Sequence, residues 1–249
     1  MKKAIIILLS MIILMNSCAK TAVTQSLLKL EAVADTFLQA ISSGDVETCL
    51  SLMADDIAFR QEPAGLSFEG KEQVKGILIF MTGWNYDWSV TNPYEIDGNR
   101  VTFSTNIHSN HYKLFGIELM RARLEFLVQD GKLVSFTIIE NEEDTAALDK
   151  LTRGNIGVQL ELQAREGAEK GIKVLEVIKN SPAQQAGISA GDLIVAINGI
   201  NCSQMTRPLE AQLRTMGPVG SQVRLIVTRE GTTMPIDMEV TRVDLSRPQ

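Results

Sequence analysis

Histidine is the residue type most often used for catalysis near neutral pH and for metal binding, and this 249-residue chain has two. His108 and His111 lie three residues apart in a segment that we predict to be a strand, so their imidazoles point to opposite faces. No cluster of cysteines or acidic residues joins them as further metal ligands. Neither lies near a plausible serine or cysteine nucleophile, so a catalytic triad has no support. We therefore predict no catalytic residue, no metal site and no cofactor.

Three aromatic side chains are the next candidates for chemistry. Trp84, Tyr86 and Trp88 occupy alternate positions, so they share one face of a predicted strand. Together they can stack on an apolar ligand, or they can pack in the core of their domain.

The N-terminal segment indicates the compartment. Two lysines precede an apolar run, Ala4–Met15, that is too short to span a bilayer comfortably. A short basic region, a short apolar region and a small residue before a cleavage site are typical of a secretory signal, here residues 1–17. The compartment indicated is the bacterial cell envelope, or otherwise the exterior as a secreted protein.

The Ser17-Cys18 pair resembles a bacterial lipobox. This resemblance implies that Cys18 is the lipidated first residue of the mature chain, anchored in a membrane. Ala19 then favours the periplasmic face of the outer membrane in a diderm bacterium. Met15 and Asn16 depart from the usual motif, which leaves an ordinary signal peptide or an uncleaved anchor as alternatives.

Charge and cysteine content limit the partners. Removal of residues 1–17 takes two lysines from the 24 basic side chains, leaving 22 against 30 acidic ones and a net charge of −8. That balance argues against binding to nucleic acid and against electrostatic binding to anionic lipid. Cys49 and Cys202 fall in different predicted domains, so we expect two buried thiols rather than a disulfide. A mature chain of about 230 residues favours two domains.

The segment Ser181–Gly199 carries the most specific local signals. Ser181-Pro182 can cap a short helix, Leu193–Ile197 is predicted to be a strand, and Asn198-Gly199 favours a hairpin turn. This order of residues resembles the core of bacterial PDZ domains, the peptide-capturing modules of periplasmic proteases and secretion proteins. The resemblance implies a circularly permuted PDZ β-barrel with two helices over residues 154–243, its last strand at the C-terminal end.

Spacing predicts the other elements of this module. Apolar and polar residues alternate over Ile156–Leu162, the pattern of a half-buried strand. Pro208–Met216 has apolar residues four apart and is followed by Gly217-Pro218, which predicts a short amphipathic helix. Two further strands are expected at Gln222–Thr228 and Met234–Val240.

A strand beside a helix leaves a groove to which an extended peptide adds as a further strand. The PDZ resemblance implies that the loop Asn155–Val158 offers backbone N–H groups to a peptide's terminal carboxylate, with Gly157 allowing close approach. For the two helix leucines, core packing is compatible with lining an apolar pocket, and Arg153 either adds charge to the loop or is a solvated linker residue. The candidate peptide-binding residues are Arg153, Asn155, Ile156, Gly157, Val158, Leu160, Leu209, Gln212 and Leu213.

Residues 25–140 are predicted to form a separate α+β domain, because helices precede an antiparallel sheet. A linker at residues 141–153, with a short acidic-capped helix, follows it. Helices are expected at Ser26–Ile41, from Asp45 through Met53 and at Lys71–Phe80, and strands at Asp55–Arg60, Tyr86–Ile96, Arg100–His111, Ile117–Val128 and Lys132–Glu140.

The stretches Phe37–Phe59 and Phe68–Gly76 resemble the SnoaL-like or ketosteroid-isomerase-like family. The resemblance implies a nuclear-transport-factor-like cone, in which helices pack on a curved antiparallel sheet. Isomerases of this fold use an Asp base with a Tyr and a protonated Asp. The matching positions fall on Phe37 for the Tyr, near Gln61 for the base and near Arg123 for the second Asp, so none is retained.

Strand parity is an independent guide to the cone interior. Phe103 and Leu124 lie on inward faces, whereas Arg121, Arg123 and Glu125 lie on outward ones. The inward side is then almost free of ionisable groups, apart from Glu62 near the mouth, and acid–base catalysis needs such a group within reach. The polar outer face is either solvated or a homodimer surface. The candidate cone pocket consists of Phe37, Glu62, Trp84, Tyr86, Trp88 and Phe103.

These patterns predict a non-enzymatic adaptor or scaffold that captures extended or C-terminal peptides of envelope proteins. In an alternative hypothesis, the cone is a hydrolase or isomerase, or carries a small apolar molecule, and the PDZ domain recruits it to partners. In a third, both modules serve only assembly.

Overall fold

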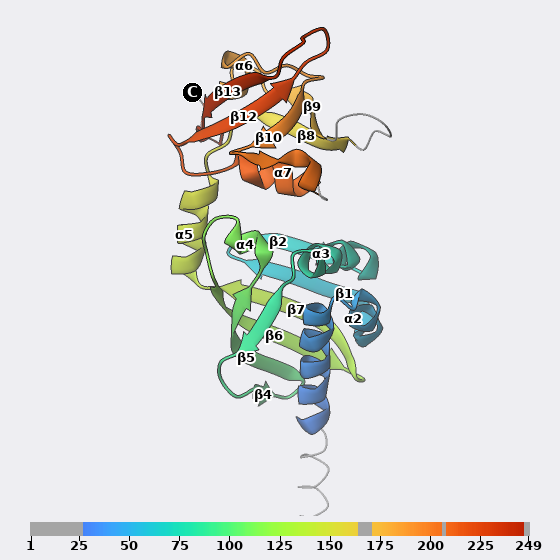
Figure 1. Ribbon diagram of the computed structural model, residues 1–249. Coiled ribbons are helices and arrows are strands. Elements are labelled where there is room, and N and C mark those ends of the chain that lie inside the picture. Colours follow the sequence, from blue (N-terminus) through green and yellow to red (C-terminus); the bar gives the residue numbers. More distant parts are fainter. Residues whose placement is uncertain (1–26, 164–170, 206–207, 247–249) are drawn as a thin grey trace, which may run out of the picture. The chain divides into compact units, whose positions relative to one another are not determined.

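The computed structural model describes residues 27–163, 171–205 and 208–246 (Figure 1). They divide into two compact units, one formed by the chain up to Tyr112 with Glu118–Asp144, the other by Lys113–Ile117 with Thr145 onward. Each unit combines helices with a sheet, so the predicted α+β class is confirmed. The predicted signal segment and Cys18 lie outside the described residues. Within those residues, no helix is long and apolar enough to cross a membrane.

The first unit begins with a helix at residues 27–43, followed by α2 (Val46–Leu52) and α3 (Lys71–Gly83). The Asp45 side chain caps α2 by accepting a hydrogen bond of 2.9 Å from the Thr48 backbone N–H. The sheet runs in the order β2-β1-β7-β6-β5-β3, with β4 paired to β5. Its strands are β1 (Met53–Glu62), β2 (Leu66–Glu69), β3 (Asp87–Val90), β4 (Glu95–Asp97), β5 (Arg100–His108), β6 (Met120–Gln129) and β7 (Lys132–Glu140).

Four features of this unit differ from the sequence-based expectation, and the first is that no strand was expected at β2. The β1 and β7 strands pair in parallel, with Gln61 opposite Ile138, so the sheet is not wholly antiparallel. The strand expected over Tyr86–Ile96 is split into β3 and β4, with Pro93, which has no N–H for a sheet ladder, between them. His111 lies on a four-residue helix, α4 (Asn110–Lys113), and not on a strand.

Aromatic rings fill the core of the first unit. Phe37, Phe126 and Phe136 meet edge to face, with ring centroids 5.1–5.4 Å apart. Phe103 and Leu124 are buried as strand parity predicts. The interior of the cone is therefore largely a packed hydrophobic core.

The second unit contains α5 (Glu142–Thr152) and a sheet in the order β13-β12-β10-β9-β8, with β11 paired to β10. Its strands are β8 (Val158–Gln163), β9 (Gly171–Val177), β10 (Leu193–Ile197), β11 (Ile200–Asn201), β12 (Gln222–Thr228) and β13 (Ile236–Thr241). The helices beside them are α6 (Pro182–Gln185), the 3₁₀ helix η1 (Cys202–Gln204) and α7 (Pro208–Thr215).

The local signals of Ser181–Gly199 form the predicted structures. The Ser181 hydroxyl accepts a hydrogen bond of 3.3 Å from the Gln184 backbone N–H and caps α6. Asn198 and Gly199 have φ values of +50° and +80°, as a tight turn between β10 and β11 requires. The last strand, β13, lies at the C-terminal end of the module, and the strand β9 was not predicted.

Both remaining cysteines are buried free thiols, Cys49 in the first unit and Cys202 in the second. Burial raises the pKa of Cys49 to about 12 and that of Cys202 to about 11. Neither thiol forms a disulfide in the structure, which confirms the expectation of two buried thiols.

Candidate functional site

The second unit has an edge strand beside a helix. β8 ends the sheet order, pairs with β9 on one side and contacts α7. Figure 1 shows α7 alongside this sheet. A peptide strand added to the outer edge of β8 would lie next to α7, which is the arrangement that β-strand addition needs.

The predicted pocket residues are mostly buried. Ile156 and Val158 are 0% and 4% exposed and belong to the core of the second unit, and Leu213 is also buried. Leu160 and Gln212 are half-buried, whereas Leu209 on α7 is 42% exposed. Leu209 is thus the most exposed of the apolar candidates.

The loop before β8 is held by internal hydrogen bonds. The Gly157 N–H donates to Asn155 Oδ1 at 2.9 Å, and the Gly157 carbonyl accepts from the Ile178 N–H at 2.9 Å. We predicted that the Gly157 N–H would face a ligand carboxylate, but Asn155 already occupies this donor. A carboxylate bound here would have to compete with the Asn155 side chain for it.

The reason for a glycine at position 157 also differs from the prediction. Its φ is +83°, and a Cβ there would lie 2.3 Å from Ser181 Cβ. The missing side chain makes room for Ser181 within the module, so close approach of a ligand is not needed to explain it.

Arg153 follows the linker helix α5 directly. Its guanidinium pairs with the Asp149 carboxylate one helical turn earlier, and its side chain is 44% exposed. These contacts fit the linker interpretation of Arg153 better than a role in the loop.

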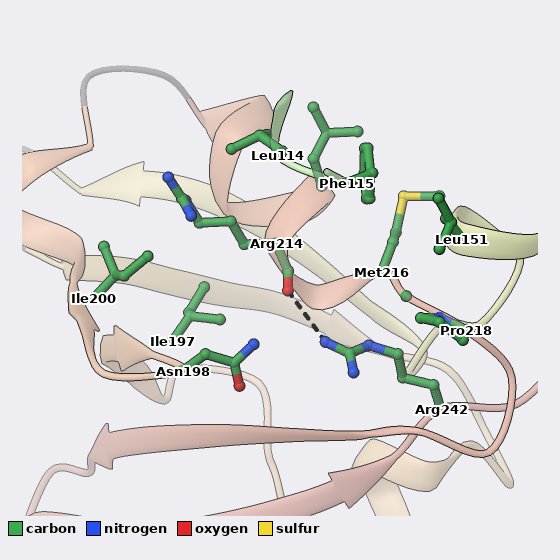
Figure 2. Close-up of a pocket in the computed structure, with 12 residues that line it drawn as sticks. Leu114, Phe115, Leu151, Ile197, Asn198, Ile200, Arg214, Met216, Pro218 and Arg242 are labelled. Atoms are coloured by element: carbon green, nitrogen blue, oxygen red, sulfur yellow. Dashed lines mark hydrogen bonds between the residues drawn. The ribbon is translucent and has the colours of Figure 1, made fainter. Parts of the chain in front are cut away.

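A pocket of about 300 Å³ also lies against α7 (Figure 2). Ile197, Ile200 and Met216 contribute apolar lining, and Arg242 contributes the buried charge. The Arg242 guanidinium donates to the carbonyls of Thr215 at 2.8 Å and Gln222 at 2.7 Å, and more weakly to that of Arg214 at 3.4 Å. Arg242 therefore holds the fold together, a role that sequence analysis missed.

The first unit contains a cavity of about 200 Å³ that the sequence did not reveal. Its polar end is formed by Gln61, Tyr86, Tyr112 and Glu140, and Glu140 is only 6% exposed. Glu140 Oε1 accepts hydrogen bonds from Gln61 Nε2 at 2.8 Å and from the Tyr112 hydroxyl at 3.3 Å. The cavity thus places a carboxylate among neutral donors.

This cluster corrects the prediction that ionisable groups are almost absent from the cone interior. Burial raises the pKa of Tyr86 and of Tyr112 above the usual phenol range. His111 adjoins the cluster, with its Nδ1 3.3 Å from the Tyr86 hydroxyl. Burial lowers the pKa of His111 to about 4, so the imidazole is neutral at pH 7.

Of the six residues predicted to form the cone pocket, Tyr86 lines this cavity. Phe37 and Phe103 are buried in the aromatic core, and Trp84 and Trp88 are also almost fully buried. Glu62 is exposed, because successive residues of β1 face opposite sides and Gln61 takes the inward position.

The outer face of the sheet carries the predicted polar side chains. Arg123 donates to Glu125 at 2.6 Å, and Arg121 pairs with Asp144 at 2.7 Å. Arg123 therefore lies on the outer face of the sheet and not in the cone interior, where its alignment with the second Asp of the isomerases would place it. No group of three His, Cys, Asp or Glu side chains that could hold a metal ion occurs in the part of the chain that the structure describes.

Comparisons with known proteins agree with the fold of the second unit. A family model described as a PDZ domain matches residues 173–229, so this unit contains a PDZ domain. The periplasmic serine endoprotease DegP of Salmonella typhimurium is 34% identical over 105 residues, which are 39% of this chain and 22% of that protein. A carboxy-terminal-processing protease of Bartonella bacilliformis is 28% identical over 161 residues, 57% of this chain and 36% of that protein. The chain thus spans well under half the length of these relatives.

Solved structures resemble the first half of the chain. A putative SnoaL-like polyketide cyclase from Shewanella putrefaciens has a TM-score of 0.42 and 14% identity, over 47% of this chain and 93% of that one. An NTF2-like protein of unknown function from Cytophaga hutchinsonii has a TM-score of 0.39 and 15% identity, over 47% and 94%. Their descriptions name the fold family that the sequence predicts for the first domain.

Proposed function

We propose that the protein is a lipid-anchored adaptor of the bacterial cell envelope that captures extended peptides, including C-terminal ones, in the groove between β8 and α7. One observation carries the proposal: β8 is an edge strand with α7 beside it, and the domain is a PDZ domain. Periplasmic relatives support an envelope location.

The proposed role is non-enzymatic, with peptide binding as the activity of the second unit. Backbone hydrogen bonds along β8 would supply affinity for many sequences. The exposed Leu209 would favour an apolar side chain near the end of the peptide. Partners would then be envelope proteins with an accessible extended segment or C-terminus.

Calorimetric titration of the full chain with peptides tests this proposal. We expect peptides with a free C-terminus and an apolar last residue to bind with micromolar affinity, about −8 kcal/mol. Leu209→Glu should weaken binding about tenfold or more, because it places a charge beside the apolar groove. Met234→Glu is the matched control, since Met234 is 76% exposed in the same unit and away from β8 and α7 in the sequence.

Amidated peptides separate two mechanisms. If amidated and free peptides bind equally, capture of the terminal carboxylate is wrong and only strand addition remains. If neither binds to the folded chain, the adaptor proposal fails and an assembly role is favoured.

A further inference from the structure

We propose that the groove between β8 and α7 selects extended peptides that alternate apolar residues with lysine or arginine, and that the Glu161 carboxylate on β8 selects the basic residues. The inference rests on the proposed capture of a peptide as a strand added to β8, and it names the class of peptide that is captured.

The two faces of β8 set different conditions for the added strand. Val158 is buried, and Leu160 and Leu162 are half-buried against the same core, to which Ala211 of α7 also belongs. The residues between them face the other side of the sheet, and Gln159 and Glu161 are exposed. An added strand continues this alternation, so every second side chain of the peptide lies on the apolar side, toward α7. The remaining side chains lie beside Gln159 or Glu161.

Glu161 is the charge nearest to a peptide on the exposed side. In a strand pair, the Cβ atoms of directly opposite residues are about 4.5–5.5 Å apart, so a peptide side chain opposite Glu161 can contact its carboxylate. In the part of the chain that the structure describes, no basic side chain lies within 4.0 Å of this carboxylate. Opposite charges stabilise such a cross-strand pair and like charges destabilise it. A lysine or arginine is therefore favoured there, and an acidic residue is disfavoured.

The next strand of the sheet adds two charges of opposite sign. On β9, Lys173 lies opposite Glu161, and Glu176 lies opposite Gln159. Both are two strand spacings from the peptide, about 10 Å, which exceeds the Debye length of about 8 Å at physiological ionic strength. Their effects are screened and oppose each other, so Glu161 decides the preference.

The helix side of the groove contributes no net charge. The charged side chains of α7 are Glu210 and Arg214, and Arg214 donates to Glu210 Oε1 at 2.9 and 2.8 Å. Leu209 and Gln212 on the same helix are uncharged. The groove thus combines an apolar side with a side that carries a negative charge, which fits a peptide of alternating apolar and basic residues.

A matched peptide series tests the inference in the full chain. Three seven-residue peptides have leucine at the odd positions, a free C-terminus, and lysine, glutamine or glutamate at the even positions. Strict alternation places the variable residues on the Glu161 side in any register. By calorimetric titration at about 0.15 M salt, we expect the lysine peptide to bind at least about fivefold more tightly than the glutamate peptide, with glutamine between them.

Two variants and a control locate the selecting charge. Glu161→Gln keeps the side-chain size and should reduce the preference for lysine over glutamate at least about twofold. Glu161→Lys should shift the preference further, toward the glutamate peptide. Glu239→Gln makes the same change in net charge at an exposed position of β13, the opposite edge of the sheet, and should leave the preference unchanged.

The outcomes separate this inference from the adaptor proposal. If the three peptides bind equally, the groove still captures peptides and the selection by charge is wrong. An unchanged preference in Glu161→Gln, or an equal loss in Glu239→Gln, would also overturn it, because net charge alone would then account for the result. If no peptide binds to the folded chain, the adaptor proposal fails together with this inference. If Glu161→Lys fails to fold by circular dichroism, the comparison of Glu161→Gln with Glu239→Gln decides alone.

Discussion

Two glycines of the second unit show the difference between a position that needs glycine for its backbone conformation alone and one that also needs it for packing. Gly157 and Gly231 have φ values of +83° and +82°. A Cβ on Gly157 would lie 2.3 Å from Ser181 Cβ, whereas a Cβ on Gly231 would have nothing within 4 Å. Both positions favour glycine for conformational reasons, but Gly157 also makes room for a neighbouring side chain.

Alanine at each position should therefore have different costs. We expect Gly231→Ala to destabilise the second unit by about 1 kcal/mol through backbone strain. Gly157→Ala should cost about 2 kcal/mol more, because Ser181 and the loop must also move. Urea unfolding followed by circular dichroism measures both. The two tryptophans of the chain, Trp84 and Trp88, lie in the first unit, so their fluorescence transition should not change. Equal costs for the two variants would refute the packing argument.

Glu140 shows which part of the cone site is predictable from the sequence. Phe136, Ile138 and Glu140 alternate along β7, so parity alone places Glu140 on the inward face. Its hydrogen-bonding partners do not follow from such a pattern. Gln61 comes from β1 across a parallel strand pair, and Tyr112 comes from a four-residue helix. Both contacts depend on tertiary structure, which short-range periodicity does not encode.

At the scale of elements, short-range signals predicted structure best. The cap at Ser181 and the turn at Asn198-Gly199 depend on residues that are neighbours in sequence, and both form as predicted. The strand β9 was missed, and it lies between β8 and β10, so its place depends on long-range pairing. The break between β3 and β4 at Pro93 had a sequence signal that the alternation of aromatic residues obscured.

The C-terminal end of α7 is stabilised by hydrogen bonds from Arg242, the residue that directly follows β13. The last carbonyls of a helix lack partners within it, and Arg242 donates to those of Thr215 and Arg214. Arg242 is 5% exposed and also donates to Gln222 on β12, so it ties the helix to the sheet.

We expect Arg242→Met to destabilise the second unit by about 3 kcal/mol, because buried carbonyls lose a charged donor. Arg224→Met is the control, since Arg224 is 60% exposed and pairs with Asp237 on the surface. That variant should cost no more than about 1 kcal/mol. The difference is measured by urea unfolding monitored by circular dichroism, and similar costs would show that Arg242 is not a structural tie.

At the scale of the whole molecule, the adaptor proposal includes attachment to a membrane. If Cys18 is lipidated, as the resemblance of Ser17-Cys18 to a lipobox predicts, the lipid would hold both units at a membrane surface. One acyl chain gives only marginal membrane affinity, so stable anchoring would require more than one.

Labelled palmitate supplied to bacterial cells checks this attachment. We expect label in the unchanged protein and none in Cys18→Ala, because the lipid is carried by this cysteine. Cys49→Ala and Cys202→Ala should retain the label, since both thiols are buried in the folded units. Label that persists in Cys18→Ala, or a mature N-terminus at another residue, would contradict the lipoprotein prediction.

The bridge between Asn155 and Val243 joins the start of the PDZ unit to its end. Two backbone hydrogen bonds of 2.9 and 3.0 Å link these residues in antiparallel register. The incoming and outgoing chain therefore leave the bridge on the same side. A tensile force applied between them would load these two bonds and the adjacent Gly154–Gly217 bridge before it reached the longer β12–β13 ladder. Under such a load the module would yield first at its ends.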